Sequence, residues 1–100
     1  MNRVDVILSQ ALEDDFLIAY EKECKKSRVK CKYTKITNVL GQGESNPRLG
    51  DSVWPQLNTQ YIIFCEEEIT AKIKNILEVL HKEYPRECAA GFVSSANELI

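Results

Sequence analysis

The sequence is short of the residues from which catalytic and metal sites are usually built. His81 is its only histidine, and no pattern places it beside a cysteine, as a cysteine–histidine nucleophile would require. The four cysteines form no C-x-x-C pair, which excludes zinc ribbons and thioredoxin-type motifs on spacing. The H-E-x-x-H and P-loop patterns are both missing. We therefore predict that the protein is not an enzyme and has no catalytic residues and no metal ligands.

Strong charge of one sign and long apolar runs are also lacking. The formal net charge of −2 offers no basic surface for nucleic acid, so we expect no nucleic-acid partner. No apolar run approaches the length of about 20 residues that crosses a bilayer. The start of the chain does not have the pattern of a signal peptide. We expect a cytoplasmic protein with reduced cysteines, folded as a single domain over residues 1–100.

Apolar periodicity predicts two helices and four strands in the order β-α-β-loop-β-α-β. The strands expected from alternation are Arg3–Ser9, Val29–Leu40, Thr59–Glu66 and Cys88–Ser95. The first helix is expected to begin at Ser9 or Gln10, and the second to run from Glu67 to Tyr84, ahead of Pro85. With two right-handed crossovers, this order predicts an α+β ferredoxin-like sandwich, in which a four-stranded antiparallel sheet has both helices on one face.

The third expected strand is apolar on both faces. Tyr61, Ile63 and Cys65 alternate on one face, and Ile62 and Phe64 lie on the other. In a small α+β domain a strand usually has one face in water, because one layer of helices covers only one face of the sheet. We therefore expect another subunit to cover the second face.

The connection between the second and third strands, at about residues 42–57, is the most unusual stretch of the sequence. It has roughly sixteen residues, whereas two-strand connections usually need about two to five. Together with Gly41 it holds three of the four glycines, two of the three prolines and the only tryptophan, Trp54. We expect this loop to be the functional element, with Trp54 docked on the protein. The alternative is a solvent-exposed loop with no function.

Within the loop we expect the main chain to turn tightly at Gly41, Gly43 and Gly50. Pro47–Gly50 is expected to form an exposed, mobile tip. Arg48 at this tip would be available to an anion or to an acidic partner.

The loop resembles that of a subgroup of the PII (nitrogen regulatory) signalling family, in which G-x-G, P-x-L-G and W-P-x-x-N follow one another. The matching residues are Gly41-Gln42-Gly43, Pro47-Arg48-Leu49-Gly50 and Trp54-Pro55-Gln56-Leu57-Asn58. The last strand, with Gly91-Phe92-Val93-Ser94, is also similar to that of the family. The ligand- or partner-binding residues that we take from the loop are Gly41, Gly43, Arg48, Leu49, Gly50, Trp54, Pro55 and Asn58.

The resemblance implies a homotrimer with its sheets facing the centre and with ligand-binding clefts between subunits. The long loop, called the T-loop in the family, would then press on a regulated partner. Members of the subgroup are associated with heavy-metal efflux systems. This implies a small ligand or a metal state as the signal, and a membrane transporter or another regulated protein as the partner.

The chain departs from the family at the turn before the last strand. A glycine- and lysine-rich turn holds nucleotide phosphates in the family, whereas this chain has Tyr84–Ala90 there. Arg48 and Arg86 are the only loop cations that could replace those contacts. We therefore predict weak or no ATP binding and leave the cofactor and ligand open. Two alternatives remain, a metal-binding trimer of the divalent-cation tolerance type and, more remotely, an acylphosphatase-like enzyme.

Overall fold

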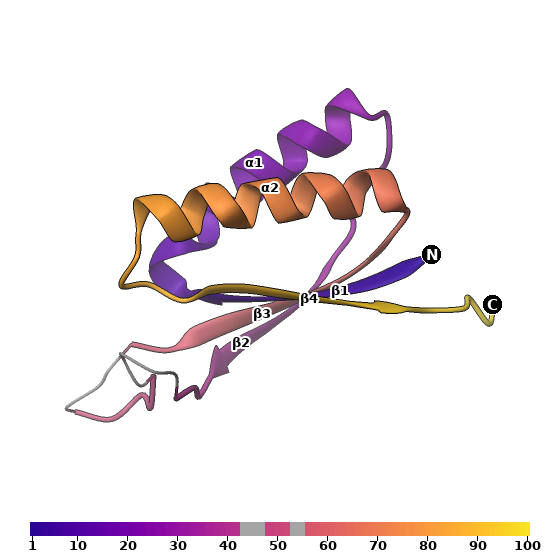
Figure 1. Cartoon of the computed structure of the whole chain (residues 1–100). Helices are drawn as coiled ribbons and strands as arrows, with labels where there is room; N and C mark the ends of the chain where they lie inside the picture. The colour runs from indigo at the N-terminus through magenta and orange to yellow at the C-terminus, as the bar shows by residue number, and fades with distance from the viewer. Residues whose placement is uncertain (43–47, 53–55) are drawn as a thin grey trace.

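The computed structural model describes residues 1–42, 48–52 and 56–100, with two helices packed on one antiparallel sheet (Figure 1). The elements are β1 (Asn2–Ser9), the 3₁₀ turn η1 (Gln10–Leu12), α1 (Glu13–Lys26), β2 (Thr34–Val39), β3 (Asn58–Cys65), α2 (Glu67–Glu83) and β4 (Ala89–Ser95). The strand order is β2-β3-β1-β4, and all neighbouring strands are antiparallel. Both helices cover the same sheet face (Figure 1), so the predicted α+β ferredoxin-like sandwich is confirmed. Neither of these helices is long and apolar enough to cross a bilayer.

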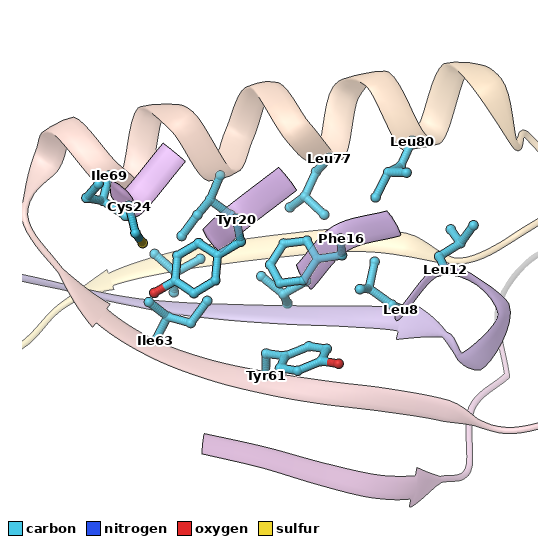
Figure 2. Close-up of a cluster of buried hydrophobic side chains, with 13 residues drawn as sticks. Leu8, Leu12, Phe16, Tyr20, Cys24, Tyr61, Ile63, Ile69, Leu77 and Leu80 are labelled. Carbon is cyan, nitrogen blue, oxygen red and sulfur yellow. The ribbon is translucent and has the colours of Figure 1, made fainter. Parts of the chain in front are cut away.

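The core lies between the two helices and the sheet face turned toward them (Figure 2). On β1 the buried residues Val4, Val6 and Leu8 share this face, because side chains two positions apart point the same way. Tyr61 of β3 packs against Phe16 of α1, with ring centroids 5.3 Å apart. The buried helix residues follow the 3.6-residue period and are Phe16, Tyr20, Cys24, Ile69, Ile73, Leu77 and Leu80. The apolar periodicity therefore identified both buried stripes.

The second strand is shorter than the sequence predicted. It covers Thr34–Val39, whereas the expected strand began at Val29. The Val29 N–H donates to the Cys24 carbonyl at 3.0 Å, and the Tyr20 hydroxyl donates to the Lys32 carbonyl at 2.7 Å. These bonds hold the segment to the second half of α1. Of the alternating apolar residues there, Cys31 packs on the edge of the core and Tyr33 contacts the Tyr61 ring of β3, while Val29 is 45% exposed. The prediction of a strand is therefore wrong for residues 29–33 and confirmed for Thr34–Val39.

Two other element boundaries differ from the prediction for local reasons. α1 begins at Glu13, because the chain leaves β1 through the 3₁₀ turn η1 before it becomes α-helical. β4 begins at Ala89 and not at Cys88. The Cys88 N–H donates to the Ser9 side chain at 2.7 Å, so it is not free to join the sheet ladder. The hydrogen bond between Cys88 and Ser9 belongs to the site described below.

The sheet face turned away from the helices carries large apolar side chains that are exposed in the single chain. Asp5 of β1 lies opposite Ile62 of β3 and Phe92 of β4 on this face. Phe92 is 63% exposed, Phe64 is 53% exposed and Ile36 is 43% exposed. Monomeric proteins seldom leave large apolar patches in water. The apolar second face is therefore present in the fold, while the subunit expected to cover it stays a prediction.

Candidate functional site

The long loop is closed at its base by main-chain hydrogen bonds. Gly41 and Arg48 form an isolated antiparallel bridge. The Gly41 N–H donates to the Arg48 carbonyl at 2.7 Å, and the Arg48 N–H donates back to the Gly41 carbonyl. The bridge fixes the main chain of Arg48 close to the end of β2.

Gly41 also lies against the start of β3. A Cβ atom on Gly41 would be 2.6 Å from Nδ2 of Asn58, closer than real side chains approach. Asn58 is 6% exposed, and its Oδ1 has no hydrogen-bond partner among the residues that the structure describes. Gly41 therefore allows a close approach between two segments, and a side chain there would require that of Asn58 to shift. Gly41 is not among the glycines with a positive φ, and the tight turn that the sequence predicted there stays a prediction.

Gly50 does provide a tight turn. Its φ of +72° lies in the left-handed region, which glycine adopts without the strain that other residues meet. A Cβ atom there would be 2.6 Å from Cδ2 of Leu57. The Leu57 carbonyl in turn accepts a hydrogen bond from the Gln10 N–H at 3.2 Å. Leu57, at the end of the loop, thus lies between Gly50 and the junction of β1 and η1.

Arg48 is the main departure from the sequence-based prediction. Its side chain is 7% exposed, and Nη2 lies 2.6 Å from Oε2 of Glu87 in the turn between α2 and β4. Nη2 also donates to the Ser9 Oγ at 3.2 Å. The prediction that Arg48 is exposed is therefore wrong, whereas Leu49 and Gly50 of the expected tip are exposed and Pro47 lies outside the described residues. The bridge to Gly41 holds Arg48 at the base of the loop, where its charge is paired inside the protein.

Ser9 connects the three segments that meet at this site. Its Oγ accepts hydrogen bonds from Arg48 and from the Cys88 N–H, the latter at 2.7 Å. Its own N–H donates to the Cys88 carbonyl at 2.9 Å. The end of β1, the loop base and the α2–β4 turn lie at one end of the sheet (Figure 1). Ser9, Arg48, Glu87 and Cys88 are called the loop-base cluster below.

The electrostatics of the loop-base cluster make the Cys88 thiol a poor nucleophile. Burial raises the pKa of the Cys88 thiol, and the nearby Arg48 charge offsets only part of that effect. The thiol therefore stays protonated at neutral pH and donates a weak hydrogen bond to the Ile7 carbonyl at 3.5 Å. Glu87 is only partly exposed, with 27% of its side chain in contact with solvent. The cluster thus consists of a buried cation paired with a carboxylate that solvent can reach.

The structure brings together three of the site residues that the sequence predicted. Gly41, Arg48 and Asn58 meet at the loop base, while Leu49 and Gly50 follow Arg48 and are exposed. The remaining three, Gly43, Trp54 and Pro55, lie outside the described residues, so the expected docking of the tryptophan stays a prediction.

Sequence reasoning missed Ser9, Glu87 and Cys88. Ser9 is the polar residue that ends an apolar strand and is 1% exposed. A polar residue at the end of an apolar strand was the one sequence signal that could have pointed to the cluster.

The structure offers no obvious metal centre in the residues that it describes. Among residues 1–42, 48–52 and 56–100, no three histidine, cysteine or acidic side chains are grouped so that they could hold a metal ion. His81 is exposed near the end of α2. The four cysteines are free thiols.

Comparisons with known proteins identify the fold. No protein-family model and no curated protein matches this sequence. Among solved structures, the chain is similar to CPII, a nitrogen regulatory PII-like protein from Thiomonas intermedia K12, bound to ADP, AMP and bicarbonate. The identity is 17% over 93% of this chain and 82% of that chain, with a TM-score of 0.68. A structure of CPII bound to ADP and bicarbonate has 19% identity, the same coverage and a TM-score of 0.63.

A protein from Thermus thermophilus described as PII-like in signalling is also similar. It has 22% identity over 93% of this chain and 83% of that chain, with a TM-score of 0.53. At these identities the likeness establishes a shared fold. The chain therefore has the fold of PII-like proteins, with its long loop between β2 and β3.

Proposed function

We propose that this chain is a non-enzymatic PII-like signalling protein in which a small ligand controls the long loop, and the loop regulates a partner. The observation that carries the proposal is the ion pair between Arg48 at the loop base and Glu87 in the α2–β4 turn. The ion pair links the loop to the α2–β4 turn. A ligand that binds where these two segments meet would therefore act directly on the loop. The fold shared with CPII supports this assignment.

The proposed assembly is a homotrimer whose open sheet faces meet at the centre. The exposed Ile36, Phe64 and Phe92 support it, since burying one such side chain contributes about 1.5–3 kcal/mol. Light scattering should give three times the 11.4 kDa mass of the chain. Phe64→Glu should dissociate the trimer, whereas Ile18→Glu, at a 67% exposed position on α1, should leave it intact. A wild-type chain that remains a monomer at micromolar concentration would refute the proposed assembly.

The ligand is proposed to be a small anion-bearing molecule. CPII was solved with ADP, AMP and bicarbonate, so these are the first ligands to test by calorimetry. We expect ATP to bind weakly or not at all, because the turn at Tyr84–Ala90 has few of the backbone N–H groups and cations that a triphosphate needs. Micromolar ATP affinity would contradict this expectation.

The partner is proposed to be a membrane transporter or another regulated protein, as the loop resemblance implies. The test is co-purification of the tagged chain with membranes from its own cells, with and without the ligand found by calorimetry. The full-length chain is compared with a variant that lacks residues 44–46. This deletion shortens the loop and keeps Gly41 and Arg48, the two residues of the bridge. Equal recovery of the same membrane protein with the full-length chain and with the deletion variant would contradict a role for the loop.

A further inference from the structure

We infer that Glu87 is a built-in competitor at an oxyanion site formed by Arg48, and that a carboxylate, carbonate or phosphate group binds by displacing it. The inference names the ligand chemistry and the regulation of the proposed function, and therefore rests on it. The starting observation is that Arg48 is charged and yet buried. Among the residues that the structure describes, it is the one charged residue in the buried set, and its side chain is 7% exposed. Burying a cation in this way requires a compensating anion.

Glu87 compensates the Arg48 charge incompletely. Its Oε2 contacts Nη2 of Arg48 at 2.6 Å, whereas the buried Nε has no hydrogen-bond partner among the residues that the structure describes. A guanidinium group presents a planar fork of N–H donors that pairs best with two oxygen atoms of one oxyanion. An oxyanion that contacts both Nη2 and Nε would satisfy the donor that Glu87 leaves unpaired.

Glu87 is also placed so that it can leave. Its side chain is 27% exposed, so a displaced carboxylate reaches water without crossing the protein interior. The Glu87 N–H donates to the Tyr84 carbonyl at 3.0 Å, which keeps its main chain within the turn when the side chain moves. Arg48 stays in position, because the bridge to Gly41 and the hydrogen bond to Ser9 do not involve Glu87.

The exchange would change how the loop is held. With Glu87 in place, a side-chain ion pair joins the loop base to the α2–β4 turn. With an oxyanion in place, Arg48 pairs with the ligand, and the turn loses its direct ion pair with the loop base and stays linked to it only through Ser9. Ligand binding and the Arg48–Glu87 ion pair are therefore mutually exclusive, and removal of the Glu87 charge should favour the ligand.

The test is calorimetric titration of the full chain with sodium bicarbonate, inorganic phosphate and ADP as separate probes. Glu87→Gln should bind the preferred probe about tenfold more tightly than wild type, because a charged competitor has become a neutral one. Glu83→Gln removes an equal charge from the exposed end of α2 and should bind as wild type does. Arg48→Lys keeps the charge but loses the fork, so its affinity should fall at least about tenfold.

The three probes separate the possible sources of the oxyanion. A preference for bicarbonate or inorganic phosphate indicates a free anion, whereas binding of ADP alone indicates a nucleotide phosphate. Equal or weaker affinity of Glu87→Gln for all three probes, relative to wild type, would overturn the inference. Absence of binding by both wild type and Glu87→Gln at millimolar concentrations would also overturn it.

Trypsin gives a second readout that does not depend on the ligand alone. Cleavage after Arg48 requires its side chain to leave the buried ion pair. Glu87→Gln without ligand should be cut faster at this bond than wild type, and the preferred anion should slow the cleavage. Mass spectrometry of fragments 1–48 and 49–100 identifies the bond. If the chain is a trimer that regulates a partner but Glu87→Gln changes neither readout, this inference fails and the proposed function stands.

Discussion

Replacing Ser9 with alanine tests whether the loop-base cluster contributes to the stability of the fold. Ser9 Oγ accepts the Cys88 N–H at 2.7 Å and Arg48 Nη2 at 3.2 Å, and the residue is 1% exposed. An alanine leaves the Cys88 N–H without its acceptor, and an unsatisfied buried donor costs about 1–3 kcal/mol. Arg48 keeps its ion pair with Glu87, so the loss of its hydrogen bond to Ser9 costs less. We expect the free energy of unfolding to fall by about 2 kcal/mol in total.

Urea unfolding followed by circular dichroism measures this change, with all proteins at one concentration because association affects apparent stability. For a urea m-value of about 1–3 kcal/mol/M, the midpoint should fall by about 1 M. Ser95→Ala removes an exposed hydroxyl from β4 and should change stability by less than about 0.5 kcal/mol. If the Ser9 and Ser95 variants have the same midpoint, the hydrogen bonds of Ser9 do not stabilise the protein and the reasoning is refuted.

Two further predictions follow from the structure, and a third, on Trp54, follows from the sequence. Gly50→Ala, at a φ of +72° and against Leu57, should destabilise by about 1–2 kcal/mol in the same urea assay. Burial favours a raised pKa of Glu13, but hydrogen bonds from Lys35 and Tyr61 outweigh it and lower the pKa below 4.5. The resulting stabilisation is present above pH 4.5 and lost as the pH falls below it, so Glu13→Gln should flatten the acid limb of the stability curve. Trp54 emission should shift to the red on denaturation, and Trp54→Ala should speed loop proteolysis while the oligomer persists; an emission maximum unchanged on denaturation would show that the ring is not docked.

Most of the fold could be predicted because its signals are local. The i, i+3, i+4 recurrence from Phe16 to Cys24 and from Ile69 to Leu80 marks the buried stripes of both helices. Alternation on β3 marks Tyr61 as buried and Phe64 as exposed on the opposite face. These patterns depend only on the repeat of each element, which neighbouring residues reveal.

The segment from Val29 to Tyr33 shows where a local pattern is insufficient. Its alternation resembles that of a strand, but the Val29 N–H bonds to the Cys24 carbonyl and not to β3. The same apolar spacing occurs in a strand and in this segment, where Tyr33 packs on Tyr61 and Val29 is 45% exposed. Only the hydrogen-bond partner distinguishes them, and the sequence does not name it.

The sequence by itself determined the two-layer fold, the long loop and the tight turn at Gly50, because periodicity and chain flexibility are properties of short segments. It also led to an exposed Arg48, since charged residues in loops are mostly exposed. Only the tertiary structure decided that this arginine is buried against Ser9 and Glu87, each 39 residues away along the chain. The physical reason is that a buried ion pair depends on where distant segments converge, and the meeting of β1, the loop base and the α2–β4 turn is a property of the assembled sheet.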